Sequence, residues 1–86
     1  MTVHVSHPDI IKRLKRAAGH LKSTIQMLED EKACLDIAQQ LHAVEKAITN
    51  AKRTLIHHHL DHCLEDAFHA GTETTLSEFK EITKYL

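Results

Sequence analysis

A seven-residue repeat of apolar side chains, sustained over two long stretches, is the feature that most limits how this chain can fold. Apolar residues recur at alternating steps of three and four, a spacing that keeps them on one face of an α-helix and is typical of helical bundles. The members are Ile11, Leu14, Ala18, Leu21, Ile25 and Leu28 in the first stretch, and Cys34, Ile37, Leu41, Val44, Ile48, Ala51 and Leu55 in the second. We therefore expect two long amphipathic helices.

Composition and local signals extend this expectation to the whole chain. Gly 2, Pro 1 and 3% aromatic residues leave few turn formers and few strand formers, which favours an all-α fold. Ser6 as N-cap, with Pro8 in the first turn and Asp9 three residues on as a capping-box variant, predicts a helix start. Residues 29–32 predict a polar break, and Thr75 with Glu78 predicts a second capping box. The sequence predicts a single domain over 1–86, with helices at about 7–30, 33–68 and 75–85.

Several classes of protein are disfavoured by what the sequence lacks. It has no run of about 18 apolar residues and no signal-peptide pattern, so we expect a cytoplasmic protein without a membrane span. It has no metalloprotease motif, phosphate-binding glycine loop or nucleophile elbow, so we do not expect an enzyme. Two cysteines in a reducing compartment favour metal binding or redox sensing over a structural disulfide.

The net charge of −1 conceals an asymmetry along the chain. Residues 1–28 contain five basic residues and one acidic residue, whereas residues 57–86 contain six acidic and two basic residues. A basic first helix can bind an anion such as DNA, although a run of charge is also typical of a solvated surface.

Three residues with metal-ligand side chains lie at opposite ends of the second helix. His59 and Cys63 have i, i+4 spacing and share a helical face, but Cys34 precedes His59 by 25 residues. That separation corresponds to about 37 Å along an unbroken helix. The three can meet only between two antiparallel copies of the helix, whose crossing near residues 47–48 would be flanked by Ala43, Ala47 and Ala51.

Two thiolates and one imidazole suit Cu(I) best, and Zn(II) is also compatible with this set. An added nitrogen from His4 or His7 would complete a four-ligand site for Ni(II) or Co(II). His62 is a candidate for an accessory role beside these ligands, although surface polarity is the simpler interpretation of His57, His58 and His62.

Three segments together resemble the CsoR/RcnR/FrmR family of small all-α bacterial transcriptional repressors. They are the basic stretch Ile11 to His20, the stretch Cys34 to Val44 with its Gln39-Gln40-Leu41 core, and His59 to Cys63. The resemblance covers roughly residues 6–68, and the most specific element is the cysteine with this Gln-Gln-Leu core and a histidine 25 residues later.

The resemblance implies a three-helix protomer, an antiparallel four-helix bundle dimer and a tetramer that binds operator DNA across a basic face. It also implies an inter-subunit site in which Cys34, His59 and Cys63 match the positions of the family's copper sensors. His20 replaces the family's usual Gln, and Glu45 replaces an Arg that many members use toward DNA. The predicted DNA-binding residues are Lys12, Arg13, Lys15, Arg16, Lys52 and Arg53.

The sequence thus predicts a repressor that binds operator DNA in the apo form and releases it on binding Cu(I). One alternative is a nickel or cobalt sensor that uses an N-terminal histidine. Another is a thiol-based sensor of polysulfide or formaldehyde, in which Cys34 and Cys63 react rather than ligate. A helical bundle or metal buffer without a role on DNA is the simplest remaining hypothesis.

Overall fold

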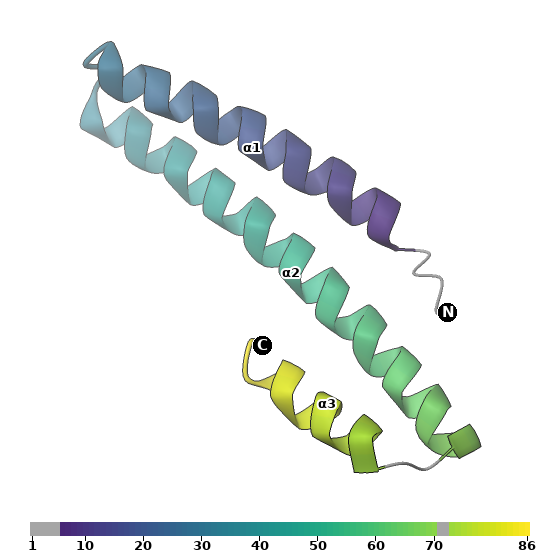
Figure 1. Cartoon of the computed structure of the whole chain (residues 1–86). Helices are drawn as coiled ribbons and strands as arrows, with labels where there is room; N and C mark the ends of the chain where they lie inside the picture. Colours follow the sequence, from purple (N-terminus) through teal and green to yellow (C-terminus); the bar gives the residue numbers. More distant parts are fainter. Residues whose placement is uncertain (1–5, 71–72) are drawn as a thin grey trace. The chain divides into compact units, whose positions relative to one another are not determined.

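The computed structural model describes residues 6–70 and 73–86; the side chains of 63–70 and 73–75 lie outside the description. Helix α1 spans His7–Glu29, α2 spans Cys34–Ala70 and α3 spans Glu73–Thr83 (Figure 1). The described residues contain these three helices and no strand, which confirms the all-α, three-helix expectation. The chain divides into two compact units, Met1–Ala51 and Lys52–Leu86, and the boundary falls inside α2. The single domain expected from the sequence stays a prediction.

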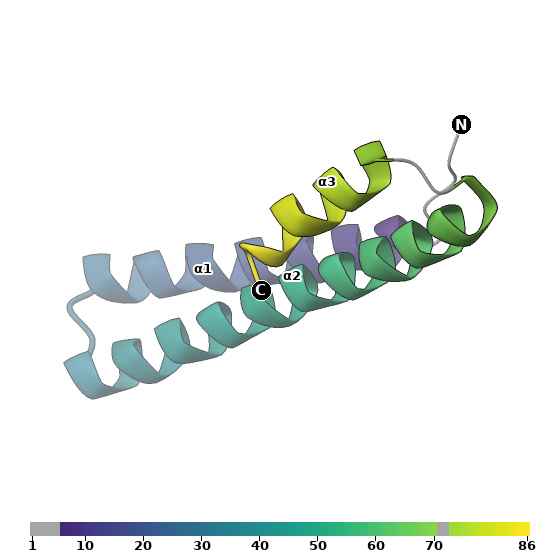
Figure 2. The same ribbon diagram turned by 90° about the horizontal axis from the view of Figure 1, so that it is seen from below.

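In the first unit, α1 and the first part of α2 lie side by side in both views (Figures 1 and 2). Their interior is formed by one residue in every seven on each helix. These residues are Ile10, Ala17 and Thr24 from α1, and Ile37, Val44 and Ala51 from α2. Thr24 is only 1% exposed, and its hydroxyl donates to the carbonyl oxygen of His20 at 2.9 Å, so its polar atom is satisfied within the helix.

A second apolar stripe on each helix stays exposed in the single chain. It contains Ile11, Leu14, Leu21, Ile25 and Leu28 on α1, and Leu41, Ile48 and Leu55 on α2. The repeat inferred on α1 is therefore the exposed stripe, and the interior uses residues one position away from it. The repeat inferred on α2 divides between the two stripes, because Ile37, Val44 and Ala51 are buried whereas Leu41 and Ile48 are not.

The turn between α1 and α2 is a glycine-free Schellman motif. The backbone N–H of Lys32 donates to the carbonyl of Met27 at 3.0 Å, and that of Glu31 donates to Leu28 at 3.1 Å. Glu31 has φ of 54°, in the left-handed region where glycine is the usual residue. The polar break expected at residues 29–32 is thus a turn. Its left-handed residue, Glu31, could not be predicted from the sequence, because glutamate is not a residue type that favours this conformation.

The start of α1 differs from the expected capping box. Ser6 is the N-cap residue, but its φ and ψ of −80° and −17° are helical and its side chain makes no capping hydrogen bond. A capping hydroxyl needs an extended backbone to reach the N–H groups of the first turn. Asp9, expected to complete the box, instead accepts a hydrogen bond from Arg13 Nε at 2.8 Å.

In the second unit, α3 turns back along the last part of α2 (Figures 1 and 2). Ile56 is buried, and Phe79 and Ile82 of α3 are half-buried. Helix α3 begins at Glu73, two residues before the expected Thr75. Within the described residues, no helix is both long and apolar enough to cross a membrane.

Candidate functional site

Cys34 is the first residue of α2 and is a free, exposed cysteine. The turn at Glu31 ends α1 and places the cysteine where α2 begins. Its neighbours Ala33 and Leu35 are also exposed. The thiol is therefore accessible to a metal ion or to a second protein chain, and it is not a buried structural cysteine.

The other candidate ligands lie far from Cys34 in the sequence. His59 is half-buried on α2 in the second unit, and Cys63 belongs to the same helix, but the side chain of Cys63 lies outside the description. His7 is half-buried at the start of α1, whereas His4 lies outside the described residues. Among the described side chains, no three His, Cys, Asp or Glu residues come together in a way that could hold a metal ion.

Two other histidines of α2 contact each other directly. The Nε2 atoms of His58 and His62 lie 3.0 Å apart in a hydrogen bond. Their ring centroids are 4.5 Å apart, and the ring planes meet at 83°. Both side chains are half-buried, so each ring is partly shielded from solvent.

The six residues predicted to contact DNA are all exposed. Lys12, Arg13, Lys15 and Arg16 occupy two turns of α1 in the first unit, and Lys52 and Arg53 lie on α2 in the second unit. Arg13 forms an ion pair with Asp9, in which the two side chains are 50% and 60% exposed. An exposed pair of this kind contributes little stability and is easily exchanged for a phosphate.

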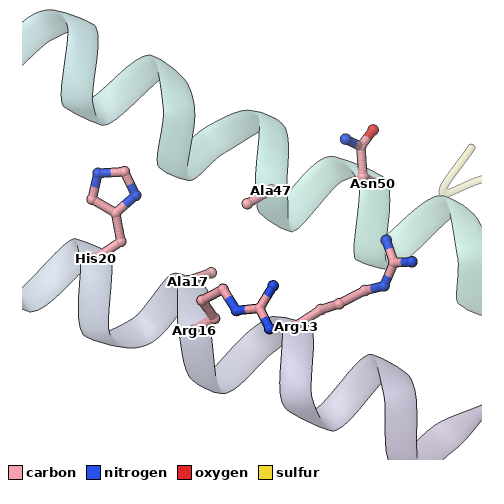
Figure 3. Close-up of a pocket in the computed structure, with 6 residues that line it drawn as sticks. All are labelled: Arg13, Arg16, Ala17, His20, Ala47 and Asn50. Atoms are coloured by element: carbon pink, nitrogen blue, oxygen red, sulfur yellow. The ribbon is translucent and has the colours of Figure 1, made fainter.

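A cavity of about 270 Å³ opens between α1 and α2 beside these arginines. Figure 3 shows Arg13 extending from α1 toward α2, Arg16 beside Ala17, and Ala47 and Asn50 on the α2 side. The small side chains of Ala17 and Ala47 leave the space, and hydrogen-bond donors from Arg13, Arg16 and Asn50 surround it. Such a set of groups favours an anionic ligand group over a cation.

His20 closes the cavity at one end and joins the two helices. Its Nε2 donates to Oε1 of Gln40 at 2.6 Å. Sequence reasoning missed Asn50. The available signal was its i, i+3 spacing from Ala47, which places both residues on the face of α2 that meets α1.

Comparison with known proteins gives a consistent result. Residues 6–85 match the family model described as "Metal-sensitive transcriptional repressor". The chain is 36% identical to the copper-sensing transcriptional repressor CsoR of Mycobacterium ulcerans, over 87% of this chain and 65% of that protein. It is 38% identical to the copper-sensing transcriptional repressor CsoR of Bacillus subtilis, over 87% of this chain and 79% of that protein.

Among solved structures, the chain is similar to the nickel-responsive transcriptional regulator InrS, with a TM-score of 0.86 and 26% identity, over 99% of this chain and 97% of that one. The chain spans about 65% of the length of the CsoR protein of Mycobacterium ulcerans. The family match nevertheless covers both units and all three helices. The resemblance inferred from the sequence is confirmed: this chain belongs to the family of metal-sensitive transcriptional repressors.

Proposed function

We propose that the chain is a metal-responsive transcriptional repressor, which binds operator DNA in its apo form and releases it when metal binds between two copies of the chain. The observation that carries this proposal is the placement of an exposed, free Cys34 at the start of the same continuous helix that carries His59 and Cys63. The family match over residues 6–85 supports it, as do the copper-sensing relatives.

The proposed metal site takes Cys34 from one copy, and His59 and Cys63 from its partner. Antiparallel pairing of two α2 helices brings opposite ends together, and the exposed apolar stripe offers a surface for that pairing. Two thiolates and an imidazole favour Cu(I), whose soft character matches sulfur ligands. When bound, the ion would supply a link between subunits that neither copy contains alone.

The proposed DNA surface is the basic part of α1 with the cavity beside it. A phosphate oxygen placed near Arg13 and Arg16 would gain two charge-assisted interactions, and Asn50 could donate a further hydrogen bond. Because such contacts release counterions, the affinity for DNA should fall steeply as salt rises.

Metal and DNA would compete through the arrangement of the subunits. We consider two arrangements of the subunits, one that binds DNA and one that metal binds more tightly. Metal then lowers the affinity for DNA, and the size of the effect is set by the difference between the metal's binding free energies for the two arrangements. A coupling free energy of about 1–3 kcal/mol, which is the usual scale, would weaken operator binding about 5- to 150-fold.

The test is operator binding by the purified full-length chain with and without Cu(I). We expect tight binding by the apo protein and a loss of affinity on stoichiometric Cu(I), and Cys34→Ser should keep apo binding while losing the response. Equal affinity with and without Cu(I) and Ni(II) would refute a metal-responsive repressor.

The DNA surface has a separate test in Arg13→Ala and Arg16→Ala. Each should weaken operator binding and reduce the slope of log affinity against log salt by about 1. Lys80→Ala on α3 is the matched control, since Lys80 is exposed and basic but outside the proposed surface. An equal loss in the control variant, or no loss in either arginine variant, would contradict the assignment.

A nickel or cobalt sensor is the second candidate, and the structural likeness to a nickel-responsive regulator favours it. In that case His4 or His7 would supply an added nitrogen ligand, and Zn(II) could occupy the same set. The result that would select this candidate is release of the operator by Ni(II) but not by Cu(I), with a response that depends on His7 or His4.

The exposed Cys34 also keeps the thiol-sensor alternative testable. Treatment of the apo protein with polysulfide would then produce a Cys34–Cys63 cross-link between subunits, visible by mass spectrometry, and release the operator without metal.

A further inference from the structure

We propose that His58 and His62 form a second metal-binding site, distinct from the proposed Cys34/His59/Cys63 site, that takes a borderline divalent ion such as Ni(II), Co(II), Zn(II) or Cu(II). The two residues have i, i+4 spacing on α2, the spacing with which paired histidines on one helix chelate zinc. The site requires only one copy of the chain.

The separation of the two ring nitrogens fits chelation. Two nitrogens that each lie about 2.0–2.1 Å from one metal, at angles from a right angle to a tetrahedral angle, are roughly 2.9–3.4 Å apart. The Nε2 atoms of His58 and His62 are 3.0 Å apart. A shift of the donor ring's hydrogen from Nε2 to Nδ1, with small rotations of the rings, would present both Nε2 lone pairs to a common ion. The ion would then replace the hydrogen bond between the two rings.

The surroundings of the pair favour a cation. The two rings are half-buried and meet edge to face at 83°, so each limits the motion of the other before any ion arrives. Asp61, one residue before His62, is exposed, and the sequence from His57 onward carries six acidic and two basic residues. A local excess of negative charge raises the concentration of divalent ions near the pair.

The second site differs from the proposed sensor site in direction and in chemistry. Successive residues of an α-helix point about 100° apart around its axis, so His58 points to a different side of α2 from its neighbour His59. Two imidazoles without a thiolate select borderline divalent ions over Cu(I), and water would complete the coordination. The two sites can therefore hold different ions at the same time.

The experiment is a titration of the purified full-length chain with Co(II), followed by optical absorption and by competition with a chelator. The wild type should bind one equivalent of Co(II) per chain at the His58/His62 site, and this equivalent should add no thiolate-to-cobalt charge-transfer band. We expect this result whether or not the Cys34/His59/Cys63 site also binds Co(II). His58→Gln and His62→Gln should each lose that equivalent and keep any thiolate band. His57→Gln, which changes an exposed histidine outside the pair, should lose neither.

Unchanged stoichiometry in His58→Gln would overturn the proposal, and so would a loss of the thiolate band together with the equivalent, because the pair would then belong to the sensor site. If the wild type showed no thiolate band but still bound the His58-dependent equivalent of Co(II), Co(II) binding at the sensor site would be refuted and the second site would be supported.

A measurement on the wild type avoids the risk that a substitution causes misfolding. On addition of Zn(II), the Nε2 resonances of His58 and His62 should shift together in nitrogen NMR. No shift at these two nitrogens at saturation would contradict the site.

Discussion

Two apolar stripes run along neighbouring faces of α1, and only one of them is buried within the chain. The buried stripe contains Ile10, Ala17 and Thr24, and the exposed stripe contains Leu14, Leu21 and Leu28 at the same seven-residue spacing. The exposed stripe is the more apolar of the two. Full burial of a leucine contributes about 1.5–3 kcal/mol, and Leu14, Leu21 and Leu28 are still 39–55% exposed. Covering this stripe would therefore add a sizeable part of that amount for each leucine.

A seven-residue repeat therefore identifies a contact surface but not the partner that covers it. On α2 the two stripes are interleaved, with Val44 at 4% exposure and Ile48 at 45%. We interpret the buried stripe as the contact between α1 and α2 within one chain. The exposed stripe is the surface we expect a second copy to cover, in line with the proposed inter-subunit metal site.

The largest effect should come from a charge in the buried stripe. Val44→Asp places a carboxylate among apolar side chains, at a cost on the order of several kcal/mol, which is comparable to the whole stability of a small domain. We expect loss of the cooperative thermal transition followed by circular dichroism. A variant that melts like the wild type would show that Val44 is not part of the interior.

The matched substitution in the exposed stripe should act on assembly. Ile48→Asp lies one helical turn from Val44→Asp and introduces the same charge, but at a position that the single chain leaves exposed. We expect the wild type to self-associate and the variant to sediment as a smaller species. If the variant kept the wild-type mass in analytical ultracentrifugation, the exposed stripe would not be the interface.

A smaller effect should follow from cutting the polar link beside the buried stripe. His20→Ala and Gln40→Ala each remove the hydrogen bond between α1 and α2, which should cost about 1 kcal/mol. In a double-mutant cycle the two losses should not add, because they break one interaction. Additive losses would show that the contact does not join the helices in solution.

The smallest effect is expected at Glu31, in the turn that joins α1 to α2. Glu31→Gly removes the strain of a left-handed conformation, which should raise stability by about 0.5–1 kcal/mol although glycine loses more entropy on folding. The melting temperature should rise while the mass of the assembly stays the same. A lower melting temperature would contradict the left-handed conformation at Glu31.

The sequence predicted the number and type of the helices because the repeat, the polar break and the scarcity of glycine and proline all agree. It did not distinguish the two stripes, because Ala17 and Thr24 are poor markers of an interior and the leucines beside them are stronger ones. The capping box at Ser6 failed because backbone angles, not residue types, determine whether the hydroxyl reaches an N–H group.

The candidate site was less accessible to sequence reasoning than the fold. Ligand types and their spacing predict Cys34, His59 and Cys63 as ligands, but a site shared between two copies would be a property of an assembly that one chain does not contain. The contact between His58 and His62 depends on rotamers, so spacing suggested a pair without giving its geometry.

Metal binding by mixed subunits is the sharpest test of a Cys34/His59/Cys63 site shared between two copies of the chain. Chains with Cys34→Ala, and chains with both His59→Ala and Cys63→Ala, should each lose Cu(I) binding at the proposed site. If Cys34 of one copy pairs with His59 and Cys63 of its partner, refolding the two variants together regenerates one complete site in every mixed dimer, and high-affinity Cu(I) binding returns. Mixed protein that binds no more Cu(I) than the separate variants would contradict a site shared between subunits.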